Sequence, residues 1–544
     1  MKLTFLSSIK TKIVSPETGI AASILALPLL LAFLHSRFHQ SYTVDDCYIS
    51  YRYAWNWAHG FGPVFNVGEY VEGYSNFLYT ALLALGHLVG FDLESLGIAI
   101  GIISFFALIL VASHFAKTRA GTYPQITMFG VGFVLAASTP IALWSRGGLE
   151  TVFFALLLFS ATASYLDYVK LGRGLAPHML LFGLVALTRP EGFAYTLPII
   201  GLELLRNLLM AKTGLSKAIV IMLKQIGVFL VIFAPFLAFR FAYYGEWLPN
   251  TVAAKDSWQQ QLFSTTISNW PHLFWVNEGT KKILTFFSKH FHVLTLVFVL
   301  GPLFLARARH FEFLAWTSSV LVSLLVIIWG QGDWMEHFRL FVPLIAPVVI
   351  MAFLGFGDAL SWLSHRERIS KLPGMALKTG KMVLFCGFVL FMAANTFYEH
   401  KPFDNRGKRH EEMIELGRQL QSVARADDLL AMGFIGRIPY MATNLRVLDT
   451  LGLTDKRIAQ RKGTGDIYGK ESLVLVLKEN PTLWVSKTPQ ERQSFLRLPD
   501  FKNRYLEIRR PTVDKDNLAV FVAKNRPDIE ALAQALSGEI RNIP

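Results

Sequence analysis

The sequence predicts a polytopic α-helical membrane protein that ends in a soluble α/β domain. The first observation is composition, because 53% of the 544 residues are hydrophobic and only 17% are charged, with a positive mean hydropathy. Soluble chains of this length rarely carry so little charge. The second is a series of long apolar runs, and the third is a return to frequent charges after residue 398.

The apolar runs are long enough to cross the roughly 30 Å of hydrocarbon in a bilayer. Examples are "GIAASILALPLLLAFL" (19–34), "LGIAIGIISFFALILVASHFA" (96–116) and "AIVIMLKQIGVFLVIFAPFLAF" (218–239). About eleven or twelve such spans precede residue 398. Basic residues precede the first run and no small-residue cleavage site follows it. We therefore expect a retained anchor with a cytoplasmic N-terminus, and not a signal peptide.

The basic loops predict the orientation of the helices. The segments "SHRERISKLPGMALKTGK" (364–381) and "ARARH" (306–310) are strongly basic, so we expect them in the cytoplasm. Several other loops then fall on the opposite side, together with the tail: 145–150, 188–192, 243–255 and 330–338. The expected location is a bacterial cytoplasmic membrane, with these loops facing the periplasm or the outside. The number of crossings between residues 76 and 124 does not follow from this scheme.

Residues 399–544 form the predicted soluble domain, of about 145 residues. Short strand-like runs ("DLLAMGF", "LRVLDTLG", "TLWVSK" and "LAVFVAK") alternate there with helical stretches such as 409–426. Residues 1–398 form the predicted membrane domain, with an outer loop at 37–75.

Several functional classes are not expected. The net charge of +14 is spread between apolar runs, as the positive-inside rule requires, so nucleic acid is not an expected partner. Cys47 and Cys386 are the only cysteines and lie far apart, and the histidines lack metal-ligand spacing. Glycine loops for nucleotides and the zinc-protease and serine-hydrolase motifs are also missing from the sequence. We expect no cofactor.

An acidic pair follows the first apolar run, in "DDCYISYRYAWNWAHGFGPVFNVGEYVEGYSN" (45–76). If a helix begins here, Asp45, Tyr48 and Arg52 share one face and Asp46 lies on a neighbouring face. Such a carboxylate suits proton abstraction from an attacking hydroxyl group. The alternative is a helix start whose aspartates only satisfy free backbone N–H groups.

Further polar side chains gather in the predicted outer loops. Ionisable groups near membrane depth are costly and tend to mark a functional cavity, and arginine or lysine suits a phosphate group. The alternative is internal ion pairing, for example between Arg189 and Glu191 or between Arg146 and Glu150. The candidates for substrate binding are Tyr48, Arg52, Glu72, Arg146, Glu150, Arg189, Glu191, Asn250, Lys255, Asp333, His337 and Arg339.

These motifs resemble a known family when they are read in order. The 45–80 segment, then "SRGGLET", "LTRPEGF", "YYGEWLPNT", "GDWMEHFRLFVPLIAP" and "RVLDTLGLTDKRIAQ", are similar to membrane glycosyltransferases of the GT-C type. The similarity is to the branch with mycobacterial terminal arabinofuranosyltransferases and pilin arabinosyltransferases, and it covers nearly the whole chain. Cys47 replaces the alanine that the family commonly has there, and Glu336 and His337 depart from its usual pattern.

The resemblance implies transfer of a sugar, such as arabinofuranose, from a polyprenyl-phosphate donor to a glycan, lipid-linked glycan or glycoprotein acceptor at the outer face. Asp45 or Asp46 would be the base of an inverting reaction. Arg189, Lys255 and Arg339 would stabilise the leaving phosphate, while Arg52, Arg146 and Glu191 would orient the helix and the sugar. A divalent metal beside the acidic pair is conceivable but not favoured, since the donor is a monophosphate. A transporter or flippase of lipid-linked sugars is the main alternative, and an assembly factor is another.

Overall fold

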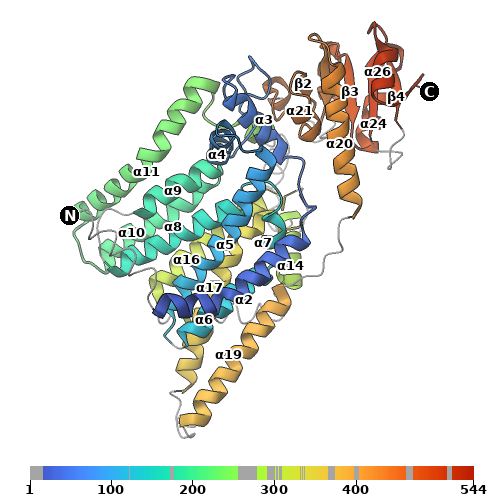
Figure 1. The fold of residues 1–544 in the computed structure, drawn as a ribbon. Coiled ribbons are helices and arrows are strands. Elements are labelled where there is room, and N and C mark those ends of the chain that lie inside the picture. Colours follow the sequence, from blue (N-terminus) through green and yellow to red (C-terminus); the bar gives the residue numbers. More distant parts are fainter. Residues whose placement is uncertain are drawn as a thin grey trace, which may run out of the picture.

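The computed structural model describes residues 16–121, 123–171, 177–254, 278–290, 301, 304–305, 309–330, 332–333, 335, 337–364, 374–396, 404–460, 470–510 and 518–543. This part of the chain forms a large body of helices, with a smaller domain that contains a β-sheet at one end (Figure 1).

The body is built from helices of very different lengths. They are α2 (Pro16–Phe38), α3 (Cys47–Ala58), α4 (Phe77–Leu88), α5 (Leu93–Arg119), α6 (Pro124–Ala137), α7 (Thr139–Trp144), α8 (Thr151–Leu171), α9 (Pro177–Thr188), α10 (Gly192–Leu209), α11 (Leu215–Tyr244), α14 (Glu278–His290), α16 (His310–Trp329), the 3-10 helix η1 (Arg339–Phe341), α17 (Val342–Ser364) and α19 (Gly374–Thr396).

Among the described residues, five helices are long and apolar enough to cross a membrane: α5, α8, α11, α16 and the continuous η1–α17 segment. Shorter apolar helices accompany them, including α4, α6 and α9. The chain is therefore a multi-pass helical membrane protein, as predicted. The number of about eleven or twelve spans stays a prediction, because residues 255–277 and 291–300 lie outside the described residues.

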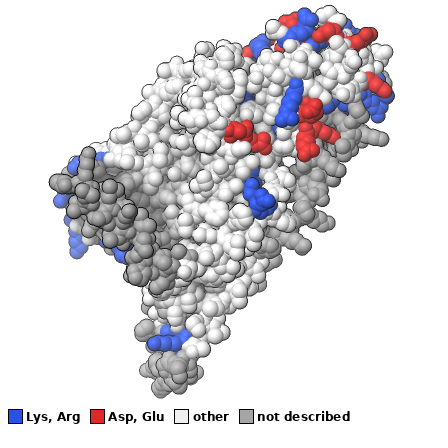
Figure 2. All heavy atoms as spheres, viewed as in Figure 1, with Lys and Arg blue, Asp and Glu red and all other residues white. Residues whose placement is uncertain are grey.

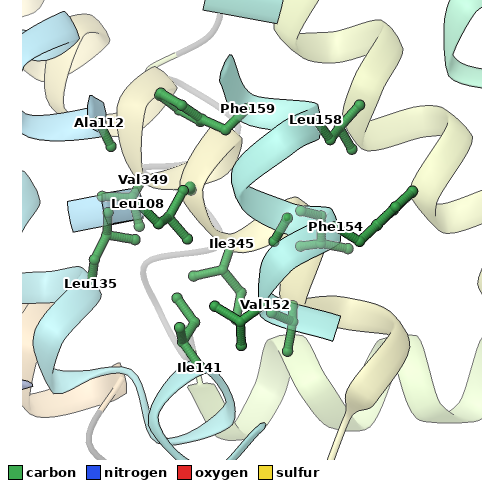
Figure 3. Packing of buried hydrophobic residues seen from close by; sticks show 14 of the residues in the cluster. Leu108, Ala112, Leu135, Ile141, Val152, Phe154, Leu158, Phe159, Ile345 and Val349 are labelled. Atoms are coloured by element: carbon green, nitrogen blue, oxygen red, sulfur yellow. The ribbon is translucent and has the colours of Figure 1, made fainter. Parts of the chain in front are cut away.

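Helix α17 forms the centre of the body. In α17, 94% of the residues in its most apolar stretch are buried inside the protein. The corresponding share is 17% in α11, which lies at the edge of the body. Ile345 and Val349 of α17 belong to one cluster of buried residues with Leu108 of α5, Leu135 of α6 and Val152 of α8 (Figure 3). Because lipid tails are as apolar as leucine, such helices associate through close van der Waals packing.

One glycine brings a functional loop against the body. A Cβ atom on Gly101 of α5 would lie 2.4 Å from the carbonyl oxygen of Ser145, a separation that real side chains do not reach. The turn between α7 and α8, which carries the "SRGGLE" motif, can therefore lie directly on α5.

The two helices between residues 76 and 121 differ in length. Helix α4 has 12 residues and spans only about 18 Å, whereas α5 has 27. In this stretch α5 is long and apolar enough to cross a membrane, and α4 is a shorter apolar helix. The helices on either side of "TRPEG" are α9, with 12 residues, and α10, with 18.

The smaller domain contains a six-stranded sheet in the order β2-β1-β3-β5-β4-β6. Its strands are β1 (Leu429–Met432), β2 (Arg446–Asp449), β3 (Leu483–Ser486), β4 (Tyr505–Arg509), β5 (Ala519–Ala523) and β6 (Glu539–Arg541). β1 pairs in parallel with β2 and β3, and the remaining pairs are antiparallel. Each strand-like run noted in the sequence forms a strand, which confirms the α/β fold class of this domain.

Helices cover this sheet and connect its strands. They are α20 (Asp404–Val423), α21 (Arg437–Met441), α22 (Lys456–Ala459), α23 (Lys470–Lys478), α24 (Pro489–Leu496), α25 (Phe501–Arg504) and α26 (Ile529–Ala535). The predicted helix at 409–426 corresponds to α20. The boundary at residues 398 and 399 stays a prediction, because residues 397–403 lie outside the described residues.

The sheet domain rests on the end of the helical body where the predicted outer loop 37–75 lies. Its short helix α21 packs against α3, and its α20 reaches α5 through His410 and Glu94. In Figure 2 the visible charged side chains gather mostly around this domain and its junction with the body, while the visible face of the body is largely uncharged. This distribution is expected when the body lies in lipid and the sheet domain in water.

Candidate functional site

Polar side chains from separate outer loops meet at the end of the body that faces the sheet domain. We call this group the polar belt, and its members are Asp46, Asn76, Glu150, Arg189, Glu191, Asp333 and Arg339. They come from the start of α3, the start of α4 and the loops before α8, α10 and η1. The belt thus unites motifs that are far apart in the sequence.

Glu150 is the central carboxylate of the belt. One of its oxygens lies 3.1 Å from Nε of Arg189, and the other accepts a 2.7 Å hydrogen bond from Asn76. Asn76 is held in turn by hydroxyl donors from Ser50 of α3 and Thr80 of α4. Glu150 is therefore fixed, through Asn76, by α3 within the first outer loop and by α4, which follows this loop. Asn76 was missed by the sequence reasoning, although it ends the motif "VEGYSN".

Arg189 links Glu150 to a second carboxylate. Its Nε atom lies 3.2 Å from Glu191, and its guanidinium group lies over the ring of Phe154 at 5.5 Å. The ion pair of Arg189 and Glu191 that the sequence offered as an alternative is thus present. It is part of a larger network, however, because Arg189 is shared with Glu150.

Arg339 forms the second cationic point of the belt. It donates two hydrogen bonds to Asp333, of 2.7 and 3.2 Å, and its charge interacts with those of Asp46 and Glu150. Its guanidinium group lies 6.0 Å from the ring of Trp144. Arg339 therefore connects the "GDWMEHFR" loop to both the acidic pair and the "SRGGLE" loop.

The backbone before Arg339 is strained. Asp333, His337 and Phe338 have φ angles of 67°, 65° and 57°, a region that is unfavourable for most side chains. Such strain persists only where the surroundings impose it, and it is common at functional sites. The carbonyl group of Asp333 accepts a hydrogen bond from Lys282 of α14, a cation that the sequence reasoning missed and that lies in "EGTKKIL".

The two aspartates of the acidic pair face different partners. Asp46 precedes α3 but makes no capping hydrogen bond to it, and its charge acts on Arg339. Asp45 is buried, and its carboxylate accepts a 3.1 Å hydrogen bond from the backbone N–H of Arg437 in the sheet domain. Asp45 thus contacts the sheet domain, while Asp46 lies near enough to Arg339 for the two charges to interact, and neither carboxylate is described by a role that is limited to capping α3.

Other candidates bind the sheet domain and not the belt. Arg52 donates to the carbonyl groups of Phe65, Pro439, Ala442 and Leu445. Tyr48 lies 3.3 Å from the imidazole of His410. These contacts give both residues a part in holding the two domains together, and their predicted role in substrate binding stays a prediction.

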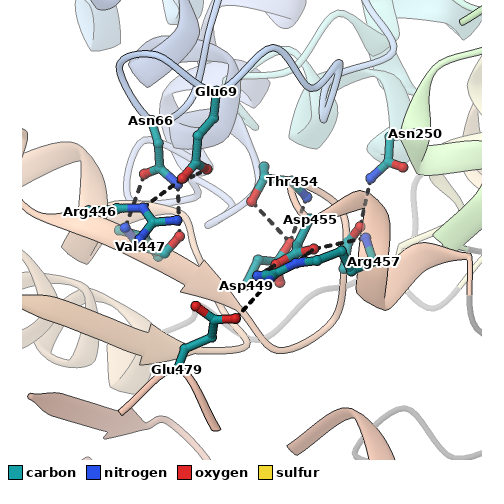
Figure 4. A network of polar contacts seen from close by, with 11 residues as sticks. Asn66, Glu69, Asn250, Arg446, Val447, Asp449, Thr454, Asp455, Arg457 and Glu479 are labelled. Carbon is teal, nitrogen blue, oxygen red and sulfur yellow. Dashed lines mark hydrogen bonds and ion pairs between the residues drawn. The ribbon is translucent and has the colours of Figure 1, made fainter. Parts of the chain in front are cut away.

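Asn250 is part of a polar network at the same interface (Figure 4). It donates 2.8 Å hydrogen bonds to the carbonyl groups of Gly452 and Leu453. The loop that carries these carbonyls is shaped by the buried Asp449, which accepts hydrogen bonds from Leu451 and Thr454. Burial raises the pKa of Asp449 to about 6.

Glu72 forms a buried pair with Arg240 at the end of α11. The two hydrogen bonds of this pair are 2.7 and 3.1 Å long, and burial raises the pKa of Glu72 to about 7. The pair connects the outer loop to α11, so Glu72 is also outside the polar belt.

The remaining candidates lie at the margin of the belt or outside the described residues. Arg146 donates a 2.9 Å hydrogen bond to Ser36, and burial together with the neighbouring Arg37 lowers its pKa. The ring of His337 packs edge-on against Tyr42, and its carbonyl group accepts from Trp144. Lys255 and Glu336 lie outside the described residues.

In the part of the chain that the structure describes, no group of three or more metal-ligating side chains could hold a metal ion. The expectation of a reaction without metal or cofactor stays a prediction.

The fold is shared with solved membrane glycosyltransferases. ArnT from Cupriavidus metallidurans bound to undecaprenyl phosphate superposes with a TM-score of 0.55 at 12% identity, over 93% of this chain and 98% of that chain. The archaeal oligosaccharyltransferase AglB from Archaeoglobus fulgidus, in complex with an inhibitory peptide and a dolichol-phosphate, gives 0.57 at 13% identity, over 96% of this chain and 75% of that chain. The chain has the GT-C fold. The resemblance read from the motifs is thereby confirmed at the level of the fold.

Two sequence comparisons add to this result. The terminal beta-(1->2)-arabinofuranosyltransferase of Mycobacterium tuberculosis is 28% identical over 249 residues, which are 43% of this GT-C chain and 38% of that protein. The match thus spans well under half of the curated relative. Residues 403–524, in the sheet domain, match a family described as a domain of unknown function, DUF8728.

Proposed function

We propose that this GT-C protein is a glycosyltransferase that uses a polyprenyl-phosphate sugar as its donor. The acceptor is a glycan, a lipid-linked glycan or a glycoprotein at the outer face of a bacterial cytoplasmic membrane, and arabinofuranose is the first sugar to test. The observation that carries the proposal is the polar belt, where the cations Arg189 and Arg339 are each paired with a carboxylate and the charge of Asp46, from the acidic pair, acts on Arg339.

The reaction is a single displacement. The acceptor hydroxyl oxygen attacks the anomeric carbon while the bond from that carbon to the phosphate oxygen breaks, and the polyprenyl phosphate leaves with the electron pair. A carboxylate of Asp45 or Asp46 takes the hydroxyl proton. Inversion at the anomeric carbon follows from attack opposite the leaving group.

The cations of the belt support departure of the phosphate. Arg189 and Arg339 are each held by a carboxylate, so they are oriented before the donor binds. Such preorganised groups stabilise developing charge without reorganisation. Lys282, placed beside Asp333, adds a third cation at the same side of the belt. The lipid tail of the donor explains why these groups lie at the ends of membrane helices and not in the sheet domain.

The test is transfer of labelled sugar from a panel of synthetic polyprenyl-phosphate donors to acceptors in native membrane extract. Wild-type protein is compared with Asp45→Asn and Asp46→Asn. Asp92→Asn is the matched control, because Asp92 caps α5 through Ser95 and its amide can still accept that bond. We expect transfer by the wild type and the control, and loss of transfer in at least one variant of the pair that still folds and binds the donor.

The transporter alternative predicts a different result. If no donor is consumed, but labelled donor crosses the bilayer of proteoliposomes and both substitutions leave this movement intact, the protein moves lipid-linked sugars and the proposal is wrong.

A further inference from the structure

The carboxylate of Asp45 is enclosed by cations of the sheet domain. Its Oδ1 atom lies 3.5 Å from the guanidinium group of Arg437 and accepts the backbone N–H of the same residue. Its Oδ2 atom lies 3.6 Å from the ammonium group of Lys487. Asp45 is only 9% exposed, so these cations replace most of the water that a carboxylate would otherwise bind.

Arg437 is itself fixed against the first outer loop. It donates a 2.6 Å hydrogen bond to the carbonyl group of Thr43, and its guanidinium group lies 4.9 Å from the ring of Tyr48. The preceding residue is Gly436, where a Cβ atom would lie 2.1 Å from the carbonyl oxygen of Asp45. Only a glycine permits the sheet domain to approach the acidic pair this closely.

Lys487 is held by a buried carboxylate of its own domain. Glu491 accepts hydrogen bonds from the backbone N–H groups of Lys487, at 2.7 Å, and Gly433, at 2.9 Å. Gly433 follows β1 and Lys487 follows β3, and these two strands are parallel neighbours. Loops at the carboxyl ends of such strands are the usual ligand-binding edge of an open α/β sheet. Here that edge holds the carboxylate of Asp45.

Other contacts also dock the two domains. Arg52 already reaches carbonyl groups of residues 439, 442 and 445, and Arg446 forms a more exposed 2.6 Å pair with Glu69. A buried ion pair adds little to stability, because the loss of hydration offsets much of the attraction between the charges. The enclosure of Asp45 is therefore better explained by a demand for position and charge at the acidic pair.

We propose that Arg437 and Lys487 are positioning residues for the acidic pair, which fix the carboxylate of Asp45 and balance its charge. The sheet domain is then a component of the catalytic centre. This inference rests on the proposed function, since it assigns a role in the transfer reaction.

Other groups surround the same carboxylate and must be considered in any test of pH dependence. The charge of Asp45 acts on Cys47 and on His410 of α20, and next to these lie Glu94 of α5, which faces His410, and Tyr48 of α3, which faces Arg437; Asp46 is the neighbour of Asp45 in the sequence. Burial, and then the charge of Arg437, lowers the pKa of His410 to about 4. His410 is thus neutral around pH 7 and does not supply the positive charge beside Asp45.

The test compares Arg437→Gln and Lys487→Gln with wild type in the full chain, by measuring kcat and KM for donor transfer as a function of pH. Arg446→Gln is the matched control, because it removes an interdomain cation that does not touch Asp45. Loss of a cation beside a carboxylate favours the protonated form. We expect the acid limb of the kcat profile to move to higher pH by about one unit in both test variants, with Arg437→Lys closer to wild type.

The possible failures are distinguishable. If wild-type protein transfers no sugar from any donor, the proposed function is wrong. If wild-type protein is active, but Arg437→Gln and Arg446→Gln lower kcat equally and leave the acid limb in place, the cations only dock the domains and the inference is overturned.

Discussion

Replacement of Arg339 by glutamine tests the central claim about the polar belt. The change removes the two hydrogen bonds to Asp333, of 2.7 and 3.2 Å, and a positive charge that acts on Asp46 and Glu150. Under the proposed function it also removes a preorganised donor to the leaving phosphate.

Arg339→Gln is expected to lower both kcat and the stability of the folded protein, and the two effects must be measured separately. Loss of one preorganised donor to a developing charge costs about 10²- to 10³-fold in kcat, or about 3–4 kcal/mol of transition-state stabilisation. The substitution also leaves the buried Asp333 without its guanidinium partner, and breaking a buried pair costs about 3–5 kcal/mol of stability. Rates must therefore be normalised to the folded, donor-binding fraction.

Arg240→Gln is the matched control. Arg240 also binds a buried carboxylate, that of Glu72, through hydrogen bonds of 2.7 and 3.1 Å, but it lies outside the polar belt. Both variants should unfold at lower temperature in detergent, and only Arg339→Gln should have a reduced kcat per folded molecule. Arg339→Lys, which keeps the charge but not the paired geometry, should lie between Arg339→Gln and wild type.

The reasoning is refuted if Arg339→Gln and Arg240→Gln have the same kcat per folded molecule. In that case Arg339 would only hold the "GDWMEHFR" loop to the body, and the leaving phosphate would be stabilised elsewhere.

The other predictions concern the sheet domain and its contact with the body. Arg52→Met removes the donor to the carbonyl groups of residues 65, 439, 442 and 445, of which those of Phe65 and Ala442 keep another donor. We expect a loss of about 1–3 kcal/mol and faster hydrogen exchange in α21, and unchanged exchange there would contradict the docking role. Burial raises the pKa of Glu491 to about 7 from 4.5, so the native state binds a proton at this carboxylate more tightly than the unfolded state does. The free energy of unfolding of the sheet domain should therefore fall by up to about 3 kcal/mol as the pH rises from 4.5 to 7. Glu491→Gln should flatten this dependence in denaturant titrations at the two pH values; an unchanged slope would show that other groups cause it.

The sequence predicted the architecture well because membrane and sheet elements have strong local signals. A helix in lipid must form all its backbone hydrogen bonds internally and expose apolar side chains. The helices α5, α11 and α17 can therefore be recognised in the sequence as apolar runs. The buried strands β1, β3 and β5 are apolar on both faces and were recognised for the same reason. β4 and β6 were missed because their sequences, "YLEIR" and "EIR", are short and partly charged.

The sequence also predicted that the site is charged, but it did not predict which residues form the site. Charges in the predicted outer loops indicated a functional region, and these residues form two ion pairs, Arg189 with Glu150 and Arg339 with Asp333, whose charges interact. Arg52 and Asn250 carried the same kind of signal and bind carbonyl groups of the sheet domain instead. A polar side chain at the boundary between the helical body and the sheet domain can face either the polar belt or the sheet domain. The local sequence has the same composition in both cases, so it does not distinguish them.

The sequence by itself thus determined the membrane-spanning body and the α/β class of the tail, since each depends on local hydropathy or strand pattern. The side of the membrane on which the polar loops lie stays a prediction from the basic loops. Only the tertiary structure decided which charges meet. Asp45 and Asp46 are neighbours in sequence, yet Asp45 binds Arg437, 392 residues away, while Asp46 acts on Arg339. The physical reason is that ion pairs form between side chains that packing brings within a few ångströms, and no local pattern encodes a contact across such a distance in the chain.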